Sequence, residues 1–298
     1  MTDILDRPAP PITPPVLQRT FGRAHVGFGV ERGATRLADL RQEGAAKIRL
    51  PRTHGGPPEA VLINTAGGLT DGDRIEQSVS LAPGATVTVT TQACEKLYRA
   101  RGDVPAHIVN RLTLAEGARL LWMPQETILF ENGRLVRRLA AEMAPDARLL
   151  VCEAGLLGRA AMGEEPTRGL LNERWEIWVD GRPFAIERSR IGGGTGALES
   201  TTQGPATLGG ARAFATVLLA APGDDALVDR AADALRSLPM PDAPADRGAS
   251  AWNGRLLLRL VTPSGLALRR ALVPALETLA GLVRGEPGSA RLPKVWAL

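Results

Sequence analysis

The sequence predicts a mainly β protein, built as a helical, solenoid-like stack of strands with two helices near its C-terminus. The first observation is composition, because 33 glycines and 23 prolines among 298 residues favour many short elements joined by turns. The second is a faint internal repeat in which a turn leads into a strand: SLAPGATVTVTTQA at 80–93, TLAEGARLLWMPQE at 113–126 and EMAPDARLLVCEAG at 142–155. A β unit cannot bury its apolar face alone, so such repeats favour stacked layers.

The spacing of the repeat makes this prediction specific. If Ala85, Ala118 and Ala147 are equivalent, the offsets are 33 and 29 residues, and Gln92 falls opposite Gln125. The alternative is that the APGA turns merely join hairpins in an ordinary β-sandwich.

A single β domain is expected over 19–298, after a flexible Pro-rich arm at 1–18. Alternating or β-branched runs predict further strands at 21–30, 34–41, 45–50, 59–64, 106–114, 128–131, 135–140, 172–179, 183–191 and 253–261. A loop rich in Pro, Asp and Ala is expected at 239–250.

The two helices are expected near 224–238 and 264–284. For the first, Asp224 or Asp225 is the predicted cap, Pro239 the end, and the apolar face is Leu227, Ala231, Ala234 or Leu235, and Leu238. For the second, Ser264 is the predicted cap, Pro274 a kink and Gly285 the stop. Both helices are expected to cover an exposed end or face of the sheet.

Composition also limits the classes of function. Lys plus Arg number 36 and Asp plus Glu 32, interspersed along the chain, so the pI of 9.6 does not predict nucleic-acid binding. Cys94 and Cys152 are isolated, which favours free thiols and a cytoplasmic location. Neither a secretory segment nor a membrane span is expected, since there is no apolar run of about 18 residues.

No catalytic and no cofactor-binding residue is predicted. His25, His54 and His107 are isolated, and no nucleophile elbow is present. The glycine-rich segment IGGGTG at 191–196 lacks the lysine and the βαβ context of a nucleotide site.

Two polar segments are unusual for a plain strand and turn. NTAGGLTDGDRIE at 64–76 is not a calcium loop, because Ala82 stands where such a loop needs a glutamate, so a structural turn is expected. TTQACEKLYRA at 90–100 concentrates hydrogen-bonding groups: Gln92, Glu95, Lys96, Tyr98 and Arg99. These groups form either an internal ion-pair network or a partner-binding surface.

Four segments together resemble the UreD (UreH) family of urease accessory proteins, from about Phe21 to the C-terminus. They are LINTAGGLTDGDRIE, TTQACEKLYRA, MPQETILF and the ending RLPKVW at 291–296. The positions carried over as motif or partner-contact candidates are Asn64, Gly67, Gly68, Gln92, Lys96, Tyr98, Arg99 and Gln125. The resemblance implies a helical β-stack with two helices, and a scaffold without enzymatic activity of its own. This scaffold would bind apo-urease and, with a UreF-type protein and a UreG-type GTPase, assist nickel delivery.

The resemblance also implies a water-filled internal passage for nickel. Asp73, Glu95 and Glu126 are the candidates for transient oxygen ligands along one polar wall, with no fixed metal site and no tightly bound cofactor. Asp71 and Cys94 depart from the family pattern, and each either adds a metal contact or is a tolerated change.

Three alternatives stay open at this stage. The three carboxylates could be buried ion pairs with Lys96 or Arg99. The chain could be a β-solenoid enzyme acting on a carbohydrate with a carboxylate pair, Asp71 and Asp73 or Glu126, although few aromatic residues are present to stack on a sugar. A nickel storage protein would need more than three histidines and two cysteines.

Overall fold

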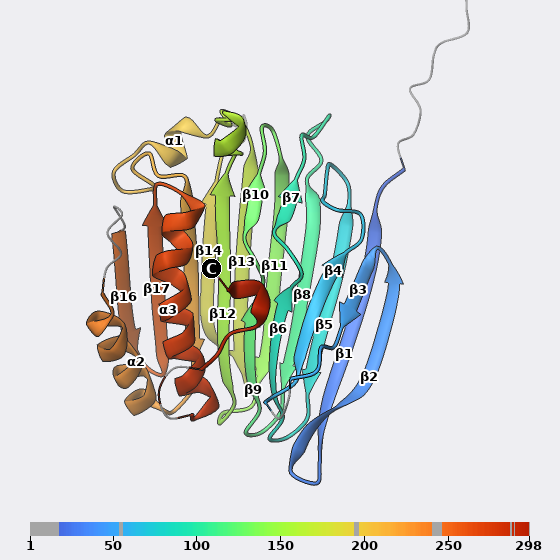
Figure 1. Cartoon of the computed structure of the whole chain (residues 1–298), viewed down its shortest axis with the longest axis vertical. Coiled ribbons are helices and arrows are strands. Elements are labelled where there is room, and N and C mark those ends of the chain that lie inside the picture. The colour runs from blue at the N-terminus through green and yellow to red at the C-terminus, as the bar shows by residue number, and fades with distance from the viewer. Residues whose placement is uncertain are drawn as a thin grey trace, which may run out of the picture.

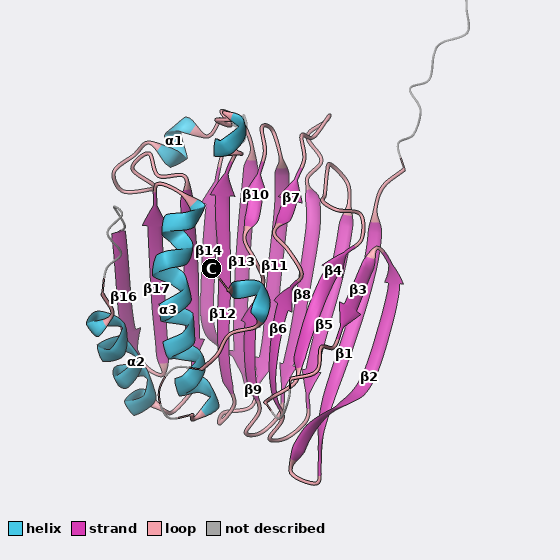
Figure 2. Ribbon diagram, viewed as in Figure 1, coloured by secondary structure: helices cyan, strands magenta, loops and turns pink. Residues whose placement is uncertain are grey.

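The structure is a computed structural model that describes residues 18–53, 56–193, 197–239, 246–286, 288 and 290–297. The expected Pro-rich arm up to residue 17, and His54, lie outside this part of the chain. Strands dominate, in two facing sheets (Figure 2).

The first sheet has seven strands in the order β14-β13-β11-β8-β5-β1-β2. Their bounds are β1 Phe21–Glu31, β2 Ala34–Gly44, β5 Arg74–Leu81, β8 Ala106–Leu114, β11 Arg134–Met143, β13 Leu170–Val179 and β14 Arg182–Ile191. The five central strands run parallel, and the edge strands β2 and β14 return antiparallel to their neighbours.

The second sheet follows the order β16-β17-β15-β12-β9-β6-β4-β3, with β7 and β10 paired beside the end of β12. The bounds are β3 Ala46–Arg49, β4 Glu59–Asn64, β6 Thr86–Thr91, β7 Glu95–Leu97, β9 Arg119–Met123, β10 Thr127–Leu129, β12 Arg148–Leu157, β15 Ala213–Ala220, β16 Asp246–Trp252 and β17 Arg255–Thr262. Strands β4, β6, β9 and β12 are parallel neighbours.

The internal repeat is the stacking unit of the molecule, as predicted. Arg119 pairs with Thr86 on one side and with Arg148 on the other, which gives the expected offsets of 33 and 29 residues. The turn alanines Ala85, Ala118 and Ala147 are fully buried, one above another. The first sheet keeps a similar spacing through β5, β8 and β11, so each repeat supplies a strand to both sheets. This parallel pairing excludes the hairpin alternative.

Two apolar cores hold the layers together. One lies between the two sheets, and the other lies between the outer face of the second sheet and the helices α2 (Asp225–Ser237) and α3 (Gly265–Arg284). Helix α2 packs on β16 and β17, and α3 packs on β17, β15 and β12. Figure 1 shows both helices on this side of the sheet, with the short helix η2 (Lys294–Trp296) beside α3. The helices therefore cover a face of the sheet, as expected.

The helix ends follow the predicted capping. The side chains of Asp224 and Ser264 accept hydrogen bonds from backbone N–H groups in the first turns of α2 and α3. Gly285 ends α3 with a φ of 73°, which favours glycine. Leu235, and not Ala234, is buried on α2, and α3 continues through Pro274.

The prediction of a loop at 239–250 is wrong for residues 246–250, which belong to β16 (Asp246–Trp252). Residues 240–245 lie outside the described residues, but β16 begins at Asp246 and pairs antiparallel with β17. Its small residues have weak β propensity, so long-range pairing at the sheet edge decides the structure there. Two further short helices are η1 (Ala160–Met162) and α1 (Glu199–Thr202). Within the described ranges, no helix is long and apolar enough to cross a membrane.

Candidate functional site

The two polar segments singled out in the sequence lie against each other. Leu69 N–H donates to the Lys96 carbonyl at 2.7 Å, and Tyr98 N–H donates to the Leu69 carbonyl at 2.8 Å. A Cβ atom at Gly68 would lie 2.3 Å from Cε2 of the Tyr98 ring, so a glycine is needed there. Gly67 has a φ of +75° and its carbonyl accepts from the Tyr98 hydroxyl at 3.3 Å. Gly68 therefore makes room for the second segment, and Gly67 provides the left-handed backbone of the turn before it.

The aspartates of the first segment are engaged by protein donors. Asp73 accepts backbone N–H bonds from Thr20 at 2.7 Å and from Thr70 at 2.8 Å. Asp71 accepts from Arg19 at 2.9 Å and from Thr70 Oγ1 at 3.1 Å. Burial acts to raise the pKa of Asp71, but the Arg101 N–H, Thr70 and Arg19 outweigh it and hold the pKa below its usual value. Both carboxylates anchor the turn to the segment before β1.

Removing the Asp73 carboxylate is expected to destabilise this turn. Asp73→Ala leaves two N–H donors without their acceptor, which lowers the free energy of unfolding by about 1–3 kcal/mol. Asp73→Asn keeps one acceptor oxygen and should lose less. Urea denaturation of both variants measures the difference, and equal stability of Asp73→Ala and the parent chain would refute the role.

Glu95 is the predicted candidate that faces the interior between the sheets. Asn64 Nδ2 donates to its two oxygens at 3.2 and 3.3 Å. Burial raises the pKa of Glu95 to about 7, the charge of Asp73 adds to the shift, and the Asn64 amide, the Lys96 N–H and Arg137 oppose it. Because Glu95 is only half-buried, it lies where the interior meets the surface.

Beyond Glu95, the interior holds an ion-pair cluster that the sequence reasoning missed. Arg137 on β11 pairs with Glu173 on the neighbouring β13, and reaches across to Glu153 on β12 at 2.8 Å. Arg137 Nη1 also donates to Thr127 Oγ1 at 3.0 Å, and the Trp122 indole N–H donates to Glu153 at 3.3 Å. Burial raises the pKa of Glu153 to about 7 against the opposing charge of Arg137.

A signal for this cluster was present in the sequence. In LVRRLAA at 135–141, Arg137 occupies the same alternating face as Leu135, Leu139 and Ala141, all of which are buried. A charged residue on a buried face requires a partner, and only the sheet register supplies the identity of that partner.

Other polar atoms of the interior lie near the cluster. Among the described residues, Asn110 Oδ1, Trp175 Nε1 and Arg137 Nε are buried and have no hydrogen-bond partner. Asn110 and Trp175 are the cross-strand neighbours of Leu139, which lies two residues after Arg137 on the same face of β11. Buried groups of this kind are commonly satisfied by water. Glu95, Asn110, Arg137, Glu153, Glu173 and Trp175 are named here the polar belt.

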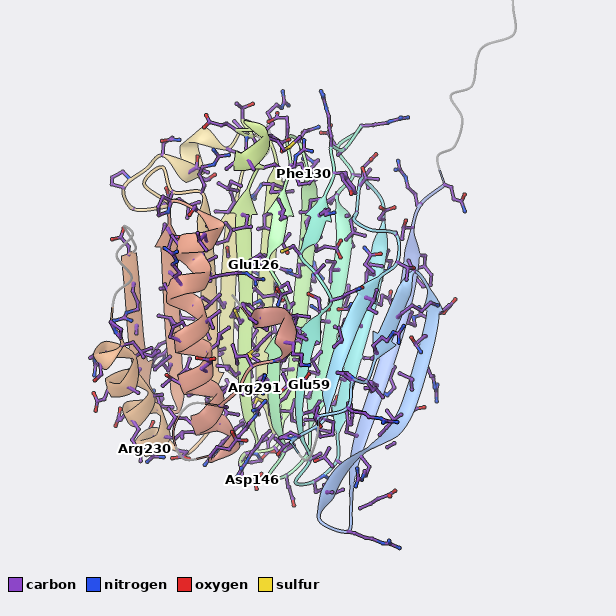
Figure 3. All side chains as sticks on the ribbon, viewed as in Figure 1. Glu59, Glu126, Phe130, Asp146, Arg230 and Arg291 are labelled. Atoms are coloured by element: carbon purple, nitrogen blue, oxygen red, sulfur yellow. The ribbon has the colours of Figure 1, made fainter. Side chains whose placement is uncertain are left out.

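Glu126 lies on the opposite face of the second sheet. It directly precedes Thr127, whose side chain points to Arg137, and adjacent strand residues face opposite ways. Both Glu126 oxygens accept from Arg269 on α3, at 2.8 and 2.9 Å, and Gln125 Oε1 accepts from the same guanidinium. Figure 3 places Glu126 beside α3. The three carboxylates predicted to share one wall are therefore not on one wall.

The other candidates in the segment at 90–100 lie at the surface. Gln92, Lys96, Tyr98 and Arg99 are exposed. Lys96 and Arg99 do not form ion pairs with the three carboxylates among the described contacts. Cys94 Sγ lies 3.4 Å from Glu126, and burial followed by the Glu126 charge raises the pKa of its thiol to about 11, so it carries a proton at neutral pH.

The metal-binding side chains of the described residues do not converge into a cage. In the described ranges, no group of three or more His, Cys, Asp or Glu residues is arranged to hold a metal ion. His25 bonds to Ser78, and His107 on β8 has its pKa lowered by burial and by Arg74 and Arg138.

Comparison with known proteins identifies the family. The family model described as UreD urease accessory protein matches residues 21–297. The chain is 44% identical to a "Urease accessory protein UreD" of Chelativorans sp. (strain BNC1), over 96% of this chain and 97% of that protein. It is 44% identical to the protein of the same name in Rhizobium etli (94% and 96% covered) and 42% identical to "Urease accessory protein UreD 1" of Brucella abortus (95% of each). The chain therefore belongs to the UreD urease accessory protein family.

Proposed function

We propose that this chain is a non-enzymatic scaffold of urease maturation that passes nickel, as cargo, through the polar belt to apo-urease. A UreF-type protein and a UreG-type GTPase are the partners that the family resemblance implies. The observation that carries the proposal is a belt of charged and polar side chains enclosed between two apolar β-sheets. Burying the Glu153 and Glu173 carboxylates in such a core is costly even with Arg137 as their partner, which favours a functional reason for their presence.

The chemistry of the belt suits transfer better than storage. Carboxylate oxygens and water bind nickel weakly compared with several imidazole or thiolate ligands. A passage must release what it binds, and release requires weak ligands. Glu95 is half-buried beside Asn64 and is the natural entry or exit, whereas Glu153 and Glu173 lie deeper.

Of the three nickel ligands suggested by the sequence, this proposal keeps one. Glu95 remains a transit candidate. Asp73 acts mainly as a turn anchor near Glu95, and Glu126 mainly as the anchor of α3, because protein donors already engage their oxygens. The carbohydrate-enzyme alternative loses support for the same reason, since Asp71 and Asp73 are both held by protein donors.

The test is the nickel dependence of urease activation. Glu95→Gln keeps the size of the side chain and removes the charge that would meet nickel, so activation at limiting nickel should fall several-fold while excess nickel restores it. Co-expression with urease and the accessory proteins, followed by ammonia release, measures activation. Pull-down of the complex measures docking, which should not change.

Glu116→Gln is the matched control, because it makes the same substitution at an exposed turn. Unaltered activation by Glu95→Gln at limiting nickel, with the complex intact, would eliminate Glu95 from the path. Loss of the complex itself would instead assign Glu95 a role in the fold.

A further inference from the structure

Arg137 occupies the centre of the polar belt, where carboxylates from both sheets converge. Its two terminal nitrogens contact one carboxylate from each sheet, Glu173 on β13 and Glu153 on β12. Its side chain is only 5% exposed, and Glu95 is near enough to act on its charge. One guanidinium therefore serves three acidic groups.

The contacts of Arg137 are those that a bound cation would otherwise make. Its guanidinium donates hydrogen bonds to Glu173 and to the Thr127 hydroxyl and forms an ion pair with Glu153, and all three partners present oxygen atoms of the kind that bind divalent cations. Arg137 Nε has no hydrogen-bond partner among the described residues, so one donor of this buried side chain is not used.

We propose that Arg137 is a built-in counter-cation that prevents the polar belt from retaining nickel. Rather than a ligand, it is a positioning residue, and it determines whether the site passes or traps a divalent cation. A positive charge at this place weakens the attraction between nickel and Glu153 or Glu173, both because it repels nickel and because it already pairs with their oxygens. This inference rests on the proposed passage of nickel between the sheets.

Replacing Arg137 should convert the belt from a path into a trap. For Arg137→Gln, we expect the full chain to bind one additional nickel ion at least about 10-fold more tightly than the parent chain, since a buried repulsive charge is removed. Equilibrium dialysis against nickel sulfate measures this. Adding Glu153→Gln to the same chain should abolish the gain.

The matched control is Arg138→Gln. Arg138 is the next residue on β11, carries the same charge and faces solvent, so nickel binding should stay at the level of the parent chain. Circular dichroism and gel filtration check that each variant is folded.

A second variant covers the case in which Arg137→Gln does not fold. Arg137→Gln combined with Glu173→Gln removes a cation and an anion together, so the net buried charge stays the same. Glu95 and Glu153 remain, and nickel affinity should still exceed that of the parent chain. Folded protein from either variant that binds nickel no more tightly than the parent would overturn the proposal.

Urease activation separates this proposal from the passage itself. A trap should lower activation at limiting nickel and recover at excess nickel. Tight nickel binding by Arg137→Gln with normal activation at limiting nickel would support the counter-cation but refute the passage. Unchanged binding together with the expected Glu95→Gln defect would refute the counter-cation and leave the passage standing.

Discussion

Arg269→Ala is expected to lower the free energy of unfolding by about 3–5 kcal/mol, because it leaves the Glu126 carboxylate buried without its cation. Glu126 is 1% exposed, and both of its carboxylate oxygens accept hydrogen bonds from Arg269. Burial acts to raise the pKa of Glu126, and the Arg269 hydrogen bonds reverse this and keep the pKa below its usual value. Unfolding in guanidinium chloride measures this loss of stability.

The reverse substitution should be milder. In Glu126→Ala the partner left behind is Arg269, whose side chain is 21% exposed and can turn toward water. The double variant should therefore be more stable than Arg269→Ala alone, and a double-mutant cycle isolates the coupling. If the two single variants lost equal stability, the asymmetry argued from burial would be wrong. If neither lost any, Glu126 would not anchor α3.

Glu153 is expected to make the stability of the fold depend on pH between about 4.5 and 7. Burial raises its pKa from 4.5 to about 7, so within this window the folded state binds a proton that the unfolded state releases. The stability contributed by the protonated form is complete below the unfolded pKa and is lost as pH rises toward the folded pKa. A shift of this size corresponds to about 3 kcal/mol.

Glu153→Gln stays neutral and should remove that dependence. Relative to the parent chain, the variant should therefore gain up to about 3 kcal/mol between pH 4.5 and 7, whatever its offset at pH 4.5. Urea denaturation at several pH values measures the difference. Glu116→Gln, at an exposed turn, controls for the removal of a surface carboxylate. A constant difference across the window would show that the folded state does not protonate Glu153 there.

Much of the fold could be predicted because local signals agree with the global stack. The turn alanines Ala85, Ala118 and Ala147 repeat at the interval that the sheet register requires. The caps Asp224 and Ser264 are fixed by hydrogen bonds within one turn, so sequence alone locates them. Strand β16 could not be predicted, since it depends on long-range contacts with β17 and α2, and an edge strand of small residues has little propensity of its own.

The candidate site was predictable only in part. The polar segments at 64–76 and 90–100 can be recognised in the sequence, because they contain more hydrogen-bonding groups than a plain strand needs. The assignment of Asp73, Glu95 and Glu126 to one wall assumed that stacking brings their side chains together. Stacking does bring β7 beside β10, where the Glu95 N–H donates to the Glu126 carbonyl at 3.0 Å. The alternation of strand side chains then separates the two carboxylates onto opposite faces.

The sequence by itself determined the stacked β architecture, the two capped helices and the family, because each rests on repeats, turns or motifs that are local in the chain. Only the tertiary structure decided which charges meet. Arg137, Glu153 and Glu173 come from three separate strands, and their contacts follow from the register between β11 and β13 and from the facing of the two sheets. A pairwise contact across sheets leaves no periodic trace in one sequence, so the polar belt and its central cation appear only when the chain is folded.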